Sequence, residues 1–269
     1  MASILGQAFS FLFFAVALFS HLQFCSCSNR LLNATLANSG WSPAVATWYG
    51  SPTGFGSDGG ACGYGNSVGQ APFSSMISAG GPSIFKNGKG CGICYQVKCT
   101  NNAACSGKPV KVVITDECKG GPCDSDPVHF DLSGTAFGAM AISGKGDQLR
   151  NAGRLQVQYQ RVQCNYPGVS VAFHVDSGSN GYYFATVIEF ENGDGDLAAV
   201  DLQESSRPGT WLSMKQSWGA VWRLDAGFKL QAPFSLRLKT IESGKTLVAT
   251  NVIPKDWKPN VTYRSHVNF

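Results

Sequence analysis

The sequence from 165 to 269 contains no cysteine, although short apolar runs continue to alternate with polar residues through it. The cysteines of the chain interior all lie upstream, between Cys62 and Cys164. Disulfide bonds therefore have no part in the second half, which must depend on its own hydrophobic core. We predict two domains, over 44–168 and 169–269, which meet at the turn-forming segment Asn165-Tyr166-Pro167-Gly168.

A hydrophobic run of membrane-spanning length is also missing. The most apolar stretch, from Ile4 to Phe24, is short for a bilayer and is interrupted by Ser20 and His21. Small residues at its end suit cleavage by a signal peptidase. We therefore predict a signal peptide over 1–28, an extended polar leader over 29–43, and secretion to the extracellular space without a membrane-spanning segment.

Clusters of one charge sign are missing as well. The formal net charge is only +4, and the chain has no polybasic run, which argues against a nucleic-acid partner. The small positive excess falls in the first domain. An acidic polysaccharide surface would suit this bias, although ordinary solvated surface charge is the commoner explanation.

What the first domain does contain is cysteine. Removal of the signal peptide leaves an even set in an oxidising compartment, which favours disulfide bonds. The set comprises Cys62, Cys91, Cys94, Cys99, Cys105, Cys118, Cys123 and Cys164. An oxidised Cys94 cannot serve as the thiolate of a papain-like protease, although the segment from Cys91 to Tyr95 nearly matches that motif. Two sequons, at Asn33 and Asn260, agree with a secretory route and are candidate glycosylation sites.

Other segments imitate ligand-binding motifs without the context that those motifs need. Gly54 to Gly59 matches a dinucleotide-binding pattern, but a cysteine- and glycine-rich loop follows where a helix is required. Asn192 to Asp196 resembles the start of a calcium loop, but Leu197 and Gln203 replace the required glycine and glutamate. The cysteine spacings also do not form the regular pairs of a zinc site. We expect neither a cofactor nor a metal.

Short runs with a period of two predict strands in both domains. They are 94–99, 110–115 and 155–164 in the first domain, and 187–191, 198–203, 234–240 and 247–253 in the second. One short helix is expected from Ser133 to Ile142, with Ser133 as its cap. The chain is thus predicted to be all-β, with a loop-rich, disulfide-stapled barrel followed by an antiparallel β-sandwich.

Asp116 and Asp131 are the acidic residues with the most suggestive positions. Asp131 lies in the segment His129-Phe130-Asp131-Leu132-Ser133, just before the predicted helix. Solvated loop acids or a helix cap would give the same pattern. A functional Asp131 would act as an acid with a pKa raised by burial, whereas a helix N-terminus lowers a carboxyl pKa, so both directions remain open.

Aromatic residues gather in the second domain, and for each of them a place in the core is the ordinary expectation. They are Tyr182, Tyr183, Trp211, Trp218 and Trp222. Tyr183 and Trp218 adjoin glycines, and we expect these two to lie flat on the surface. Exposed aromatic faces can stack on the apolar faces of sugar rings. Such stacking would bind a polysaccharide without depending on any particular hydroxyl group.

Six motifs, in this order, resemble the expansins and among them the β-expansins. They are Thr47 to Gly50, Gly59 to Tyr64, Gly90 to Tyr95, His129 to Ser133, Gly153 to Cys164 and Ser217 to Arg223. The resemblance runs from about 44 to 263. It implies a six-stranded double-psi β-barrel similar to family-45 endoglucanases, followed by a β-sandwich similar to grass-pollen group-2 allergens that serves as a carbohydrate-binding module.

The resemblance also implies a disulfide pattern. Cys62 would pair with Cys91, Cys94 with Cys164, and Cys99 with Cys105, which leaves Cys118 for Cys123. The bridge that closes the longest loop should contribute most to stability, because it restricts the unfolded chain most.

Residue by residue, Asp131 matches the catalytic acid of the family-45 hydrolases. The resemblance places Thr47, Tyr49, Asp116 and His129 in the surrounding groove. Trp48 belongs to the same motif and is a further candidate for glycan contact, beside Tyr183 and Trp218. The hydrolases carry a second Asp, the catalytic base, just after the motif of Thr47 to Tyr49, where this chain has Gly50 and Ser51. Asp58 lies further along, and we do not expect it to replace this base because its loop is glycine-rich and anchored by cysteine.

The resemblance therefore implies a non-enzymatic, monomeric cell-wall protein that binds cellulose and matrix polysaccharides such as xylan. It would loosen plant walls by disrupting contacts between these polymers without cutting a bond. Two alternatives remain open, namely a weak endoglucanase and a secreted polysaccharide-binding protein without mechanical action.

Overall fold

The computed structural model describes residues 40–56 and 60–269. The predicted signal peptide, most of the leader, the sequon at Asn33 and Asp58 lie outside these residues. The remainder, Gly40 to Phe269, forms one compact unit that holds both predicted domains. Its described helices are all too short or too polar to span a membrane.

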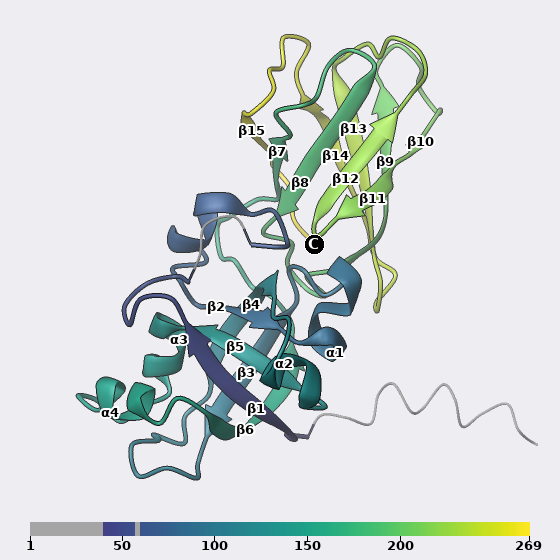
Figure 1. Ribbon diagram of the computed structural model, residues 1–269. Coiled ribbons are helices and arrows are strands. Elements are labelled where there is room, and N and C mark those ends of the chain that lie inside the picture. The colour runs from purple at the N-terminus through teal and green to yellow at the C-terminus, as the bar shows by residue number, and fades with distance from the viewer. Residues whose placement is uncertain (1–39, 57–59) are drawn as a thin grey trace, which may run out of the picture. The chain divides into compact units, whose positions relative to one another are not determined.

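Six strands of the first domain close into a barrel (Figure 1). They are β1 (Ser42–Tyr49), β2 (Ile77–Gly80), β3 (Cys94–Cys99), β4 (Val110–Glu117), β5 (His129–Ser133) and β6 (Leu155–Val162). Around the barrel their order is β1-β5-β2-β4-β3-β6, with β1 parallel to β5 and β2 parallel to β4. This confirms the predicted six-stranded barrel. Strand β1 begins at Ser42, inside the segment expected to be leader.

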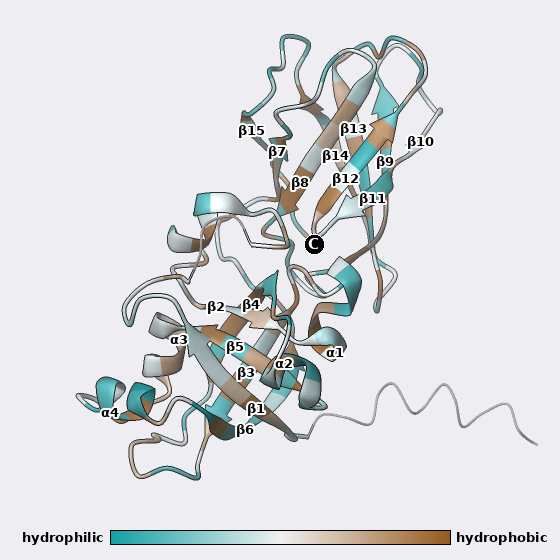
Figure 2. Ribbon diagram, viewed as in Figure 1, coloured by the Kyte–Doolittle hydropathy of each residue, from teal (hydrophilic) through white to brown (hydrophobic). Residues whose placement is uncertain are grey.

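Alternation along β5 separates the barrel core from the functional face. Phe130 and Leu132 are fully buried in the core, where the Phe130 ring packs against Tyr95 and Tyr159 at centroid distances of 5.3 and 5.2 Å. Because successive side chains of a strand point to opposite faces, His129 and Asp131 point away from this core. Figure 2 shows the corresponding mixture of apolar and polar residues along the barrel strands.

The helices of the barrel domain are short. They are α1 (Pro82–Phe85), α2 (Pro122–Ser125), α3 (Gly134–Ala139) and α4 (Gly146–Asn151), with 3₁₀ turns η1 (Gly65–Gly69) and η2 (Lys86–Gly88). Ser133 caps α3 as expected, because its hydroxyl accepts a hydrogen bond from the Ala136 amide. The helix ends earlier than the predicted Ile142, and the segment before it is strand β5 rather than the start of a helix.

Four disulfide bonds staple the barrel domain, and their pairs are those that the resemblance implied. They join Cys62 to Cys91, Cys94 to Cys164, Cys99 to Cys105 and Cys118 to Cys123. The bridge from Cys94 to Cys164 spans the longest separation, 70 residues. The Cys164 backbone also exchanges two hydrogen bonds with Gly193, so this bridge ties the end of the barrel to the second domain.

The second domain is a sandwich of two antiparallel sheets. Its strands are β7 (Ala172–Val175), β8 (Tyr183–Glu189), β9 (Leu197–Glu204), β10 (Leu212–Ser213), β11 (Lys215–Trp218), β12 (Val221–Asp225), β13 (Phe234–Thr240), β14 (Thr246–Ile253) and β15 (Thr262–Arg264). One sheet has the order β10-β9-β13-β14 and the other β11-β12-β8-β7-β15. Phe173, Phe184 and Phe234 fill the core between them.

Strand β8 begins at Tyr183, four residues before the predicted start at Val187. The reason is that β8 is covered on both faces. Phe184 and Ile188 pack into the sandwich core, whereas Ala185 and Val187 pack into the apolar cluster of the barrel. A strand that is buried on both faces has no alternation of apolar and polar residues to reveal it.

Polar contacts supplement this shared apolar cluster between the two domains. The Ser67 hydroxyl donates to a Glu189 carboxylate oxygen at 2.7 Å, and the Arg161 guanidinium pairs with Asp196 at 3.0 Å. The Ala220 amide donates to the Cys62 carbonyl at 2.9 Å. The two domains therefore meet through a hydrogen-bonded and partly apolar contact.

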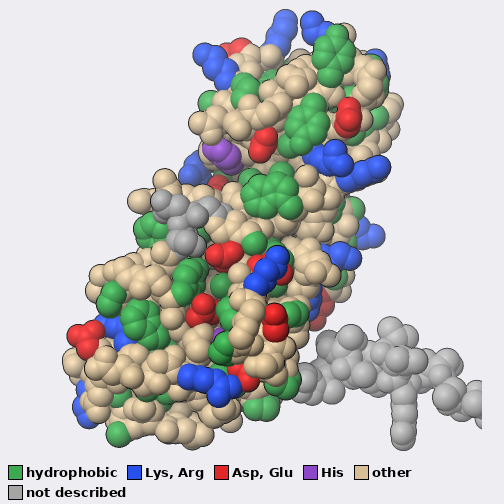
Figure 3. Space-filling view, viewed as in Figure 1, with side chains coloured by type: hydrophobic (Ala, Val, Ile, Leu, Met, Phe, Trp, Pro, Cys, Tyr) green, Lys and Arg blue, Asp and Glu red, His purple; other side chains and the backbone are tan. Residues whose placement is uncertain are grey.

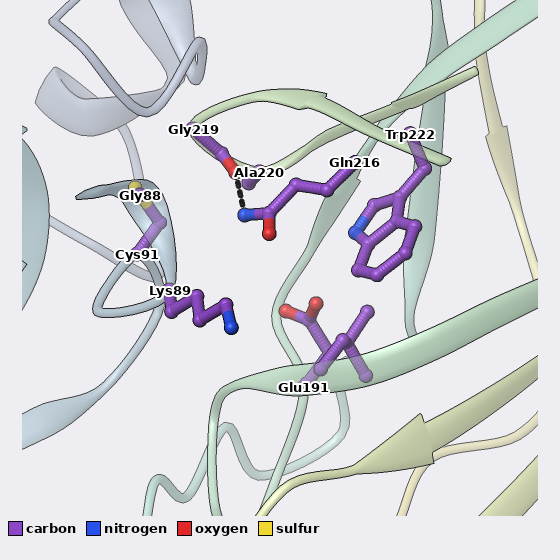
Figure 4. Close-up of a pocket in the computed structure, with 9 residues that line it drawn as sticks. Gly88, Lys89, Cys91, Glu191, Gln216, Gly219, Ala220 and Trp222 are labelled. Carbon is purple, nitrogen blue, oxygen red and sulfur yellow. Dashed lines mark hydrogen bonds between the residues drawn. The ribbon is translucent and has the colours of Figure 1, made fainter. Parts of the chain in front are cut away.

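Glu191 lies at this contact, in a pocket that also includes Lys89, Gln216 and Trp222 (Figure 4). Only 5% of Glu191 is exposed. Burial raises the pKa of the Glu191 carboxyl to about 8, with further increases from Glu189 and Asp196. At mildly acidic pH the carboxyl is consequently neutral, which is the form that a buried site tolerates.

Replacing Glu191 with Gln should make the protein less sensitive to alkaline pH. A folded-state pKa above the ordinary value means that the native state holds the proton more tightly, so wild-type stability falls as pH rises from about 4.5 to about 8. We expect the free energy of unfolding to fall by about 3 kcal/mol more in wild type than in Glu191→Gln between pH 5 and pH 8. Denaturant titrations would measure it, with Asp256→Asn, at an exposed turn, as control. Parallel pH curves for wild type and Glu191→Gln would contradict the assignment.

The bridge from Cys94 to Cys164 should stabilise the fold more than the bridge from Cys118 to Cys123. The two bridges join cysteines that are 70 and 5 residues apart in the sequence, respectively. The chain-entropy relation gives about 4 and about 2 kcal/mol for such loops. Paired Cys→Ala variants compared by thermal unfolding should therefore show the larger fall in Tm for the long bridge, and equal falls would show that loop length is not the deciding factor.

Candidate functional site

A row of side chains crosses four neighbouring barrel strands. Asp116 of β4 is paired with Ala79 of β2, Ala79 with Asp131 of β5, and Asp131 with Thr47 of β1. Paired residues on adjacent strands present their side chains to the same face. The barrel therefore brings Thr47, Asp131 and Asp116 together from distant parts of the sequence, with only the small Ala79 between the two carboxyl groups.

Asp131 is a partly buried acid in the middle of this row. Burial raises the pKa of its carboxyl, and the nearby Asp116 raises it further. The Thr47 hydroxyl, which donates to Asp131 Oδ1 at 2.6 Å, and His129 both act in the opposite direction but do not prevail. Burial thus decides the direction that the sequence left open, and Asp131 lies on a strand rather than in the first turn of a helix.

Asp116 has a different environment. Its Oδ1 accepts hydrogen bonds from the Ala61 amide at 2.6 Å and from the Glu117 amide at 2.7 Å. The chain at Gly60 passes so close that a Cβ there would lie 2.6 Å from the Thr115 carbonyl oxygen. Asp116 therefore fixes the segment after Gly60 against the end of β4.

Tyr49 follows Thr47 on the same face of β1, because the two are separated by one residue of the strand. Burial raises the pKa of its hydroxyl well above the ordinary value, and Asp116 and Asp131 raise it further. The phenol consequently stays protonated and is a hydrogen-bond donor near both carboxyl groups. Gly56 passes against its ring, since a Cβ there would lie 2.2 Å from a ring carbon.

His129 is wholly buried beneath the row. Its Nε2 lies 2.8 Å from the Thr47 hydroxyl and its Nδ1 lies 2.9 Å from Asp126 Oδ2. The Cys118 and Cys123 sulfurs lie within 4.8 Å of an imidazole nitrogen. They are bonded to each other, so they have no thiolate to offer a metal ion.

The structure does not bring Trp48 to the row. Its side chain points to the opposite face of β1 from Thr47 and Tyr49. The indole Nε1 donates to the Arg150 carbonyl at 2.9 Å, and its ring packs beside Phe137 at a centroid distance of 6.5 Å. Trp48 thus helps to seat α3 and α4 on the barrel.

The sandwich aromatics divide into exposed and buried members. Trp218 at the end of β11 is 50% exposed, and one ring edge faces Gly63, where a Cβ would lie 2.9 Å from the indole. Tyr183 is only partly buried, and its neighbour Tyr182 is 57% exposed. Trp222 belongs to the sandwich core. Figure 3 shows large hydrophobic and acidic side chains exposed on one face of the molecule.

Known families match both domains. Residues 77–159 match the double-psi β-barrel family described as "Lytic transglycolase", and residues 171–254 match the one described as "Expansin C-terminal domain". Expansin-B11 of Oryza sativa subsp. japonica is 63% identical over 232 residues, which cover 86% of this chain and 78% of the rice protein. Expansin-B4 of Arabidopsis thaliana is 53% identical over 258 residues, or 96% of this chain and 97% of that protein. The chain belongs to the β-expansins. This confirms the resemblance drawn from the sequence motifs.

Solved structures of bacterial relatives share the fold of this β-expansin. The apo expansin of Clavibacter michiganensis and a variant of it in complex with cellohexaose both align with a TM-score of 0.63. The alignments cover 85% of this chain and 98% of each bacterial chain, at 21% and 20% identity respectively. Both domains of the β-expansin are thus included in the likeness.

Sequence reasoning missed two residues of the β-expansin site, Asp126 and Arg154. Asp126 accepts hydrogen bonds from both His129 and Arg154, and it lies three residues before His129 in a turn after α2. Arg154 lies just before β6. Neither belongs to a strand or to an apolar pattern, so no sequence signal distinguishes them from solvated surface charges. Only the tertiary contact identifies them.

Proposed function

We propose that this β-expansin binds cellulose and matrix glycans of plant cell walls and loosens the contacts between them without hydrolysis. The proposal rests on the row of side chains from Thr47 to Asp116. It contains one acid with a raised pKa, Asp131, and a second carboxylate that is engaged by two backbone amides. Inverting hydrolysis needs a second carboxylate that is placed to activate a water molecule, and Asp116 instead holds the loop after Gly60.

The side chains of this row are suited to bind a sugar chain by hydrogen bonds to the hydroxyl groups of the sugar. Asp131 offers carboxyl oxygens, and Tyr49 offers a phenolic proton on the same face. Each glucose hydroxyl can both donate and accept a hydrogen bond, so these groups can replace contacts that a glucan makes with its neighbours. Such exchange separates polymers without breaking a covalent bond.

The sandwich supplies a second contact of a different kind. Trp218 exposes half of its surface, and Tyr182 and Tyr183 are accessible at the other end of the same sheet, where Tyr183 pairs with Asp225. Aromatic faces bind sugar rings through buried C–H groups and do not depend on particular hydroxyls. The sandwich would thus hold the polymer while the barrel row acts on it.

The relatives support this proposal. The proteins of high identity are named expansins, and one structure of the same fold contains cellohexaose. The predicted signal peptide and the sequons at Asn33 and Asn260 agree with secretion to the wall as a glycoprotein. The carbohydrate-binding role of the sandwich follows the same family relationship.

Asp131→Asn should test the barrel row. The amide keeps the shape of the carboxyl but cannot titrate, and the loss of one strong hydrogen bond corresponds to about a tenfold change. We expect wild-type extension of isolated walls under constant load to rise from pH 7 to pH 5, without release of reducing sugar. Extension by Asp131→Asn should be about tenfold lower at pH 5 and independent of pH. Equal creep with both proteins would refute the role of Asp131, and sugar release during long incubation would favour an endoglucanase.

Trp218→Ala should test the sandwich contact. We expect an affinity for cellulose that is weaker by about fivefold, since stacking of an aromatic ring is worth about 1 kcal/mol. Trp211→Ala is a matched control, because Trp211 packs on Arg237 of the other sheet at 4.5 Å from the ring centroid. A pull-down with microcrystalline cellulose measures both. Equal loss in the two variants would point to a general effect on the domain instead of a stacking site.

A further inference from the structure

A continuous chain of hydrogen bonds runs from the barrel surface to Asp131. Arg154 donates to Asp126 Oδ1 at 2.6 Å, and Asp126 Oδ2 lies 2.9 Å from His129 Nδ1. His129 Nε2 lies 2.8 Å from Thr47 Oγ1, and Thr47 Oγ1 lies 2.6 Å from Asp131 Oδ1. Every link has hydrogen-bond geometry, so the position of each proton depends on the others.

When Asp131 is ionised, the hydrogen-bond chain requires a particular set of protons on its members. An ionised Asp131 only accepts, so the single hydroxyl proton of Thr47 must point to it. Thr47 then accepts from His129, which must carry a proton on Nε2. Asp126 also only accepts, because its pKa is held below the usual range by its hydrogen bonds to His129 and Arg154. His129 must therefore carry a second proton on Nδ1 and be an imidazolium.

A second arrangement satisfies the same four links with the same number of protons. Here Asp131 is protonated and donates to Thr47, and the Thr47 hydroxyl donates to a bare Nε2 of His129. The Nδ1 proton stays on the hydrogen bond to Asp126. The chain thus has two states, an ion pair of His129 with Asp131 and a neutral pair of the same residues.

We propose that Asp126 is a positioning residue that sets the protonation of Asp131 through His129 and Thr47. The proton on His129 Nε2 moves to Thr47 Oγ1 as the Thr47 hydroxyl proton moves to Asp131 Oδ1. Imidazolium and carboxylate thereby become neutral imidazole and carboxylic acid, with no proton gained or lost. The inference rests on the proposed role of Asp131 in the glycan groove and adds the residues that control its charge.

The surroundings favour transfer along the chain over exchange with water. His129 has no exposed surface, and the Cys118 to Cys123 disulfide packs beside its ring. Gly81 closes another side, since a Cβ there would lie 3.3 Å from His129 Cβ. Nothing but Thr47 and Asp126 is hydrogen-bonded to the ring nitrogens among the described residues.

The charged and titratable groups around Asp131 bias the two states in opposite directions. Asp116 lies across Ala79 and favours the neutral pair, as does burial, whereas the hydroxyl of Thr47 and a positive His129 favour the ion pair. Tyr49 faces both carboxyl groups as a neutral phenol. The Asp126 carboxylate, compensated on its outer side by Arg154, stabilises the imidazolium and hence the ion pair.

Asp126→Asn should shift this balance toward the neutral pair. Without the carboxylate, His129 holds its second proton less tightly, and Asp131 loses its cationic neighbour. We expect the ratio of protonated to ionised Asp131, read at one fixed pH from the NMR shift of its carboxyl carbon, to rise by about tenfold. Wall extension at that pH should rise with the protonated fraction. Asp147→Asn is the matched control, because Asp147 forms an equivalent ion pair with Arg150 but its side chain is 89% exposed.

Nitrogen-15 labelling of histidine reports the other end of the chain. The protein has only four histidines, of which His129 is the buried one in the barrel, so its two ring nitrogens can be assigned. In wild type, the ionised fraction of Asp131 and the imidazolium fraction of His129 should be equal at a given pH, because one proton is shared between the two residues. Unchanged fractions for both residues in Asp126→Asn would overturn the proposal.

Thr47→Val and Thr47→Ser complete the test, and Thr47→Val serves if Asp126→Asn does not fold. Serine keeps the hydroxyl and should keep the two fractions equal, whereas valine has the same shape without it and should make the two fractions independent. Equal fractions in Thr47→Val would contradict the relay. Because NMR does not depend on wall extension, the relay can hold even if Asp131→Asn shows that the proposed function is wrong, and the reverse also applies.

Discussion

The parallel pairing of β1 with β5 is the constraint on which the functional face depends. It places Thr47 level with Asp131, although the two are 84 residues apart in the sequence. A parallel pair needs a long crossover, and here the crossover carries three other strands and most of the disulfide bonds. Barrel closure keeps the register from slipping, since a shift of one residue would turn Asp131 into the core.

The chemistry of the face follows from a competition between burial and hydrogen bonding. Burial disfavours a charge on Asp131, whereas Thr47 and His129 favour it, and burial prevails. Asp116 is held by two backbone amides instead. Two carboxyl groups in one row thus receive different roles from their surroundings, one able to change its charge and the other fixed as part of a loop.

The contact between the domains adds a second acid that depends on burial. Glu191 is neutral in mildly acidic conditions, where the carboxyl fits its enclosed pocket. Burial likewise raises the pKa of the Asp131 carboxyl. Acidification therefore favours the neutral form of both acids, the one at the domain contact and the one in the groove. The absence of cysteine from the sandwich leaves its position dependent on this contact, on the backbone pairing at Cys164 and on the shared apolar cluster.

The sequence by itself determined the succession of barrel and sandwich, the all-β class and four of the nine described sandwich strands, because composition and period-two alternation are local properties of the chain. Its motifs also named the family and the residues Thr47, Asp116 and Asp131. Only the tertiary structure decided that β8 begins at Tyr183, that Trp48 turns away from the row and that the pKa of Asp131 is raised. It alone joined Asp126 to the site. These properties depend on what covers a side chain and on which distant atoms meet it, and such contacts exist only once the barrel has closed.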